Sequence, residues 1–272
     1  MRIIYVTDLH GDKRSYERLF KIAKSFRANM VINGGDMLPI MGDLFKQGEF
    51  ITGYLENHFL QFDSAGIYYL CFLGNDDLRI FDGILEKTCN KFSFVVPLAQ
   101  RKFEIEGYSF IGMNWIADYP FPLKDRCRMD TNDYIFEEQL GKGLLSTTNG
   151  WKEIEDWFAY AKTLPTIEKE LNRLLQPDNM ENSVYVIHMP PHKLGLDRCF
   201  DGKEVGSKAV YDFLLKNHPK LSLHGHIHES PEVSGRWFAK LGNTVCIQPG
   251  QLGEFTYVTI DLSTMHFDRI KE

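Results

Sequence analysis

Short apolar runs alternate along this chain with longer stretches in which apolar residues recur at helical spacing. Apolar runs typical of buried strands occur at residues 2–7, 30–33 and 67–73. Between the first two runs, Asp12 can cap a helix, and the stretch 48–66 has helical spacing as well. The order strand, helix, strand, helix, strand predicts an α/β fold.

The second half of the chain is less regular. The stretch KFEIEGYSFIGMNW is typical of a hairpin that turns at Glu106-Gly107, whereas 151–177 has the spacing of one or two helices. A helix is expected at 207–216, and β structure at 184–187, 221–223, 237–239, 244–247 and 255–262. Without repeats or low-complexity linkers, we expect one domain over residues 1–272, with an insertion or cap at about 116–180.

Composition narrows the class of protein. The chain is 43% hydrophobic and 25% charged, as globular proteins are, and its net charge of -6 argues against a large nucleic-acid surface. No apolar run approaches the roughly 18 residues that a membrane span needs. The first apolar run has only about four residues before a charged turn, so we interpret it as a strand and not a signal peptide.

The five cysteines are few, widely spaced and without a CxxC pair. Reduced thiols in a cytoplasmic protein are therefore the expectation. No arginine stands six residues after any cysteine, which excludes the loop of the cysteine-nucleophile phosphatases.

Polar residues follow five of the predicted strands at their carboxyl ends. They are Asp8 and His10, then Asp36, then Asn75, then His188, and finally His226 and His228. In open α/β sheets the functional site forms at these ends. Mixed carboxylate and imidazole ligands suit Mn, Fe, Zn or Ni, and seven ligands fit two ions that share a bridging carboxylate. Two such ions roughly 3.5–4 Å apart can clamp a phosphoryl group and activate water.

These residues resemble the motif series of the calcineurin-like metallophosphoesterases: DxH, GD, GN(H/x)(D/E), a lone H, and GHxH. The matches run from residue 8 to residue 228. The resemblance implies a β-sandwich flanked by α-helices on both sides, a four-layer αββα arrangement. It also implies two divalent transition-metal ions, with manganese favoured, and a metal-bridging hydroxide that attacks phosphorus. Asp8, His10 and His228 would bind the first ion; Asn75, His188 and His226 would bind the second; Asp36 would bridge both.

Asp76 departs from the family pattern, since many members have at this position a histidine that contacts phosphate and can protonate the leaving group. An additional carboxylate repels a dianionic monoester more than a monoanionic diester, which favours a phosphodiesterase. A nucleotide or cyclic nucleotide is among the candidate substrates. The alternatives are a phosphomonoesterase or nucleotidase with the same metals, and a non-catalytic binding or scaffold protein. Seven intact ligand positions argue against the last.

Asp76, His192 and His224 are the candidate catalytic residues. His192 follows a Pro-Pro bend after His188, so it either reaches the substrate or is an ordinary loop histidine. His224 either orients a ligand, replaces the missing acid, or is bonded to backbone at a strand end. Arg126 and Arg128 either hold a phosphate or lie in a solvated loop.

Overall fold

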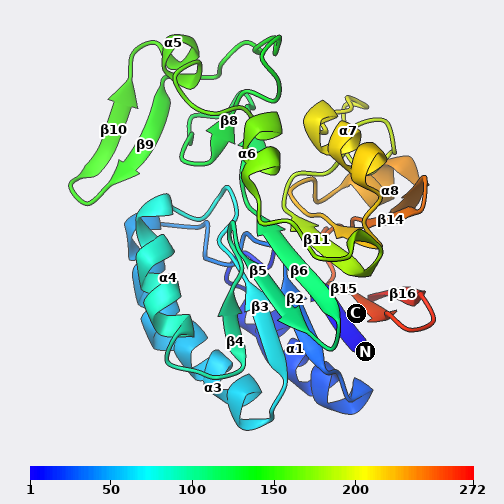
Figure 1. The fold of residues 1–272 in the computed structure, drawn as a ribbon. Helices are drawn as coiled ribbons and strands as arrows, with labels where there is room; N and C mark the ends of the chain where they lie inside the picture. Colours follow the sequence, from blue (N-terminus) through cyan, green and yellow to red (C-terminus); the bar gives the residue numbers. More distant parts are fainter.

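The computed structural model describes residues 1–272 and contains two six-stranded sheets (Figure 1). The first has the strand order β16-β15-β1-β2-β3-β4. Strands β1 to β4 are parallel, and β15 and β16 extend the sheet antiparallel. Its strands are β1 (Arg2–Val6), β2 (Met30–Asn33), β3 (Tyr68–Cys71), β4 (Val95–Pro97), β15 (Thr256–Asp261) and β16 (His266–Lys271).

The second sheet has the order β13-β14-β12-β11-β6-β5, with a parallel centre and an antiparallel strand at each edge. The expected hairpin joins β5 to β6 at Glu106-Gly107, and both turn residues have positive φ. The strands are β5 (Lys102–Ile105), β6 (Tyr108–Met113), β11 (Ser183–Ile187), β12 (Leu221–Leu223), β13 (Phe238–Leu241) and β14 (Thr244–Ile247).

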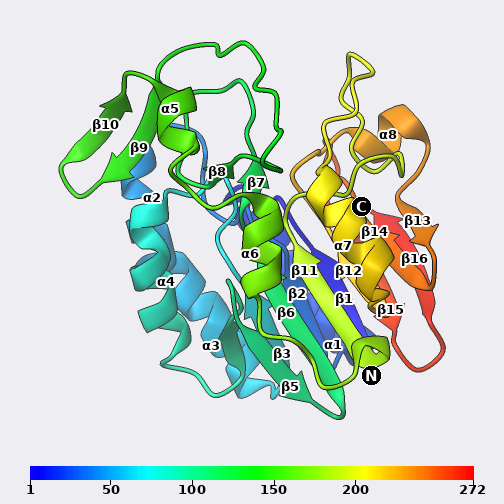
Figure 2. The same ribbon diagram turned by 45° about the horizontal axis from the view of Figure 1, so that its top comes forward.

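Helices cover the outer face of each sheet (Figures 1 and 2). Against the first sheet lie α1 (Lys13–Phe26), capped by Asp12 as expected, α3 (Glu56–Ser64) and α4 (Asp82–Cys89). A π-helical turn at Ile51–Leu55 joins α2 (Gln47–Phe50) to α3. Against the second sheet lie α6 (Ile167–Arg173) and α7 (Lys208–Asn217). Helix α5 (Trp157–Ala161) lies beyond the upper end of the sheet but contributes to the same apolar cluster, and α8 (Ser230–Ser234) follows the last motif.

Three apolar clusters fill the spaces between the layers. In β1, Ile4 and Val6 pack toward the helices, whereas Ile3 and Tyr5 point into the space between the sheets. Successive side chains of a strand point to opposite faces, so one uninterrupted apolar run can serve both contacts. The strands of the second sheet are likewise apolar on both faces, and the apolar cluster on the outer face includes residues of α5, α6 and α7. The expected four-layer αββα fold is confirmed.

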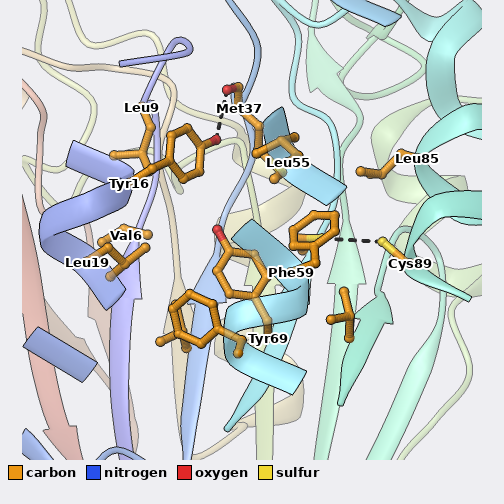
Figure 3. Packing of buried hydrophobic residues seen from close by; sticks show 14 of the residues in the cluster. Val6, Leu9, Tyr16, Leu19, Met37, Leu55, Phe59, Tyr69, Leu85 and Cys89 are labelled. Carbon is orange, nitrogen blue, oxygen red and sulfur yellow. Dashed lines mark hydrogen bonds between the residues drawn. The ribbon is translucent and has the colours of Figure 1, made fainter. Parts of the chain in front are cut away.

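The apolar cluster beneath α1 and α3 also contacts the loop after β2, which carries the candidate ligand Asp36. Figure 3 shows Tyr16 of α1, which is fully buried, donating a 2.8 Å hydrogen bond from its hydroxyl to the carbonyl oxygen of Met37. Met37 directly follows Asp36 at the end of β2. Apolar packing in this layer therefore fixes the backbone next to a candidate ligand.

Two local expectations were wrong. Residues 150–154 form strand β10 (Gly150–Ile154), paired with β9 (Gly143–Thr147), and helix begins only at Trp157. Tryptophans at helical spacing suggested a helix, but the chain turns at Thr148-Asn149, and Gly150, at φ 107°, begins β10 opposite Thr147. Strand β16 was not expected, because all of its residues are partly or fully exposed and carry little apolar signal.

The segment 116–180 contains this hairpin, α5, α6 and a short parallel pair of β7 (Ile116–Ala117) and β8 (Cys127–Arg128). In Figure 2 much of it projects beyond the upper end of the two sheets. Its assignment as an insertion stays a prediction. No helix has the length and apolar character that crossing a bilayer requires.

Candidate metal centre

The seven candidate ligands lie together where strands of both sheets end. The loops after β1, β2 and β3 bring Asp8, His10, Asp36 and Asn75, and those after β11 and β12 bring His188, His226 and His228. Each sheet therefore contributes part of the site.

One group of potential ligand atoms comes from Asp8, His10, Asp36 and His228, all within 4.8 Å of one another. The Nε2 atoms of His10 and His228 are 3.0 Å apart, and His228 Nε2 is 3.5 Å from Asp8 Oδ1. This set contains the three residues that the family resemblance assigns to a first ion, together with the bridging aspartate.

A second group adjoins it around His188, which is fully buried. Its Nε2 lies 2.8 Å from Asn75 Oδ1 and 3.3 Å from Asp36 Oδ2, and its ring centroid is 5.5 Å from that of His226. Asp36 therefore lies between the two groups.

The orientation of these side chains suits cations. His188 donates its Nδ1 proton to the carbonyl oxygen of Gly34 at 2.8 Å, so Nε2 can present a lone pair to the centre. Asp36 Oδ2 is buried without a hydrogen-bond partner, its nearest nitrogen being His188 Nε2 at 3.3 Å, whereas Asp36 Oδ1 accepts a hydrogen bond from the Asp76 amide. A buried carboxylate oxygen without a donor is costly, and a bound ion would satisfy it.

Backbone strain is concentrated at the same place. Four candidate ligands have φ between 44° and 71°, in the left-handed region that residues other than glycine rarely adopt: Asp8, His10, Asp36 and His226. Amide hydrogen bonds hold these turns: Asp8 to Gly35 and His10 to Asp36, each at 2.9 Å. Such strain persists only where the surrounding structure enforces it, and it commonly marks functional sites.

Close approach, rather than turning, explains two of the motif glycines. A Cβ at Gly74 would lie 2.7 Å from Asp36 Cγ and closer still to the Asp36 amide nitrogen. At Gly225 a Cβ would lie 2.7 Å from Asp8 Oδ2. Neither glycine has positive φ, so both are needed because they leave space for a carboxylate.

Opposing charges shift the pKa values of the histidines in different directions. Burial works against the charged form of His188, but Asp36 and then Asp8 outweigh it and raise its pKa to about 9. Burial likewise opposes the charge on His228, whose hydrogen bond to Asp8 raises its pKa to about 9. His226 has no such partner, and burial lowers its pKa to about 3. The metal-free site therefore holds protons near positions that cations would take.

Metal binding should therefore release protons. Since His188 and His228 have pKa values raised to about 9, both are charged near pH 7 in the metal-free protein, and ligation requires neutral rings. We expect at least about two protons released per protein near pH 7, fewer near pH 9, and apparent affinity that rises over this range. Calorimetric Mn²⁺ titrations of chelator-treated protein in buffers of different ionisation enthalpy measure the release. Proton-neutral binding near pH 7 would contradict these protonation states.

A cavity of about 1080 Å³ opens above the centre. Asn75, His226 and His228 line it, together with two of the candidate catalytic residues, Asp76 and His192. His224 does not line it. That residue is fully buried and donates from Nδ1 to the carbonyl oxygens of Ile187 and Met189, at 2.9 and 3.1 Å.

Asp77 is a supporting residue to which the sequence assigned no role. Its buried carboxylate accepts the amides of Met37, Leu38 and Gly74 at 2.8–2.9 Å, and so joins the loop of Asp36 to the loop of Asn75. Its place at the acidic end of the GN(H/x)(D/E) motif was the available signal.

Arg126 fits neither of the two expectations for it. It is 1% exposed, donates from Nε to the carbonyl oxygen of Gly74 at 2.6 Å, and pairs with Asp82. Arg128 is also buried and lies over the Trp115 ring, 3.8 Å from its centroid. Both arginines are structural, and Arg126 supports the loop that carries Asn75.

Comparisons with known proteins bear on the family and the fold. The sequence model described as "Calcineurin-like phosphoesterase" matches residues 1–230. No curated protein matches the chain significantly. Among solved structures, the protein TT1561 of Thermus thermophilus is similar with a TM-score of 0.61 and 18% identity over 99% of this chain and 98% of that one. A dimetal phosphatase from Danio rerio is similar with a TM-score of 0.50 and 10% identity, over 95% of this chain and 91% of that one.

At these identities the structural likenesses concern the fold alone. The family match is independent of them, and it spans all five motifs and both sheets up to α8. The chain belongs to the calcineurin-like phosphoesterases.

Proposed function

We propose that this protein is a phosphodiesterase that works with two divalent transition-metal ions, manganese being the first to test. The observation that carries the proposal is the convergence of seven ligand-type side chains beneath one cavity. The residues that would hold the ions are Asp8, His10 and His228 for one, Asn75, His188 and His226 for the other, and Asp36 for both. When bound, the ions would supply Lewis acidity toward the phosphoryl oxygens and toward water.

Asp76 supports a diester over a monoester. It lines the cavity beside the centre, where burial and then the charge of Asp36 raise its pKa to about 7 in the metal-free protein. Bound cations favour the ionised form of a neighbouring carboxyl group. The resulting carboxylate would repel a dianionic monoester more strongly than the single charge of a diester.

His192 is the residue best placed to protonate the leaving group. Its Nδ1 lies 3.2 Å from Asp197 Oδ2, and Asp197 is fully buried and also accepts the Gly206 amide at 2.8 Å. The His192 side chain is 32% exposed and lines the cavity, and its Nε2 has no protein partner. A carboxylate on one ring nitrogen stabilises the imidazolium and leaves the other nitrogen to donate. His224, held by two carbonyls beneath the site, would instead position the His188 and His226 loops.

Replacing His192 with asparagine tests this role. We expect kcat/KM to fall about 10²- to 10⁴-fold for diesters with an alkoxide leaving group, which needs a proton, and much less for p-nitrophenolate. The matched control is His266→Asn, at a histidine that is 73% exposed on β16. Equal losses for good and poor leaving groups would show that His192 is not the acid.

The overall proposal is tested with bis-p-nitrophenyl phosphate and p-nitrophenyl phosphate. Metal-loaded protein should contain about two ions and should hydrolyse the diester faster. Faster hydrolysis of the monoester would instead establish a phosphomonoesterase or nucleotidase. If neither ester is hydrolysed in the presence of Mn²⁺, Ni²⁺ or Co²⁺, and the metal content is negligible, an enzymatic role is refuted. Cyclic nucleotides are the next substrates to compare.

A further inference from the structure

The cavity above the metal centre has an apolar wall that no part of the chain covers. Its exposed members come from four separate segments, and their side chains are 39–86% exposed. We call them the cavity wall; they are Ile40, Phe121, Ile135, Trp151 and Phe200. In Figure 2 the chain between β7 and β9 and the loop before α7, which carry three of them, project at the same upper end of the molecule. Exposed apolar groups gathered around a cavity commonly mark a binding site.

The cavity wall reaches the metal centre through aromatic contacts. Phe121 packs on Tyr119 with their ring centroids 5.4 Å apart. Tyr119 in turn packs on the candidate ligand His226, with 6.0 Å between centroids. A substituent on a phosphoryl group at the metals would therefore meet an apolar surface directly.

The tyrosine and aspartate groups beside the cavity wall are already paired within the protein. The Tyr119 hydroxyl donates to the carbonyl oxygen of Leu123 and that of Tyr134 to the carbonyl oxygen of Asp118. The Asp118 carboxylate is itself occupied by Lys124, Trp157 and Gln139. A nucleobase would have to bury its polar edge against a wall with few free partners, which is unfavourable.

Charge around the cavity also disfavours substrates with several phosphates. The only lysines that line it, Lys203 and Lys208, form ion pairs with Glu137 and Asp212. No arginine lines it, while Asp76, Asp201 and Glu229 add negative charge. The metal centre is thus the one place suited to a phosphoryl group, and a second anionic group would meet repulsion.

We propose that the substrate is a phosphodiester carrying an aliphatic chain, an alkyl or acyl group, that lies against the cavity wall. The proposal rests on the phosphodiesterase function above and names the substrate class of that site. The volume of about 1080 Å³ exceeds what a phosphoryl group alone occupies and leaves room for a chain.

The test uses p-nitrophenyl phosphodiesters whose second substituent is methyl, butyl, hexyl or octyl, below the concentrations at which they aggregate. With metal-loaded protein, each added methylene should raise kcat/KM about two- to fourfold until the cavity wall is covered. The phosphodiester bond and the leaving group stay the same, so the slope against chain length isolates the apolar contact.

Two variants locate the contact. Phe121→Ala and Phe200→Ala should flatten the slope, because kcat/KM for the octyl diester should fall several-fold more than kcat/KM for the methyl diester. The control is Leu60→Ala, at a leucine on α3 that is 49% exposed, close to the 53% of Phe121, and lies outside the cavity. The slope of this control should equal that of wild type.

The outcomes distinguish the aliphatic-substrate proposal from the phosphodiesterase proposal on which it rests. Hydrolysis of all diesters at a rate independent of chain length, or faster hydrolysis of cyclic nucleotides, would overturn the aliphatic substrate and leave the phosphodiesterase intact. If no diester is hydrolysed, the proposed activity fails, and binding of methyl- and octylphosphonate to metal-loaded protein still decides the substrate class. Octylphosphonate binding at least about 10-fold tighter supports the aliphatic contact, and equal affinities overturn it.

Discussion

Replacing Asp36 with asparagine is expected to abolish phosphoesterase activity and to remove the second equivalent of bound metal. The loss in kcat/KM should be at least on the order of 10³-fold, because the carboxylate lies between both groups of ligands and its Oδ2 has no other partner. Asparagine keeps the shape but removes the charge. Metal content by emission spectroscopy and diester hydrolysis at saturating Mn²⁺ measure the two effects.

The same substitution has a readout that does not depend on catalysis. Asp36 is the main cause of the raised pKa of His188, so that pKa should fall well below about 9 in metal-free Asp36→Asn protein. NMR titration of the imidazole follows it. Asp178→Asn, at an exposed surface aspartate, is the control and should keep wild-type metal content. Two bound ions and near-normal activity in Asp36→Asn would refute the bridging position.

Replacing Gly74 with alanine should be nearly as damaging, although it removes no functional group. The new Cβ would overlap the carboxylate and amide of Asp36. The loop cannot retreat easily, since the Gly74 amide donates to Asp77 and its carbonyl accepts from Arg126. We expect a loss of about 1–3 kcal/mol in unfolding free energy and at least about 10²-fold in kcat/KM, because a displacement near 1 Å at a catalytic group suffices.

Gly83→Ala is the matched control for this substitution. Gly83 lies in α4, and a Cβ there would meet nothing within 4 Å. Alanine is the better helix former, so this variant should gain about 0.5–1 kcal/mol and keep full activity. Chemical denaturation and diester hydrolysis compare the pair. Wild-type stability and activity in Gly74→Ala would mean that the approach of the two loops is looser than described.

Much of the fold follows from sequence because its strands are buried on both faces. Uninterrupted apolar runs predicted 30–33, 221–223 and 244–247 with the bounds that β2, β12 and β14 have. Prediction of strands from apolar runs fails where a strand is only partly buried. Strand β10 exposes three of its five residues, and its tryptophan and isoleucine, with the aromatic residues that follow, imitate a helical period.

The sequence named the candidate ligands but not the residues that support them. Ligands follow strands and sit in short motifs, so their positions are visible along the chain. The contacts of Asp197 with His192 and of Arg126 with Gly74 depend instead on irregular loops, which have no period to detect. The division of the ligands between two sheets was likewise hidden, because local patterns do not specify which strands become neighbours.

The left-handed backbone at Asp8, His10, Asp36 and His226 has an evolutionary consequence. Aspartate and histidine are among the few side-chain-bearing residues that tolerate this conformation, and both are also good ligands for divalent metals. Under the metal binding proposed above, selection at these positions acts twice, on the donor atom and on the shape of the chain. In a descendant that no longer needed metals, only the second constraint would remain. Drift at these positions should then lead preferentially to glycine or asparagine rather than to arbitrary residues.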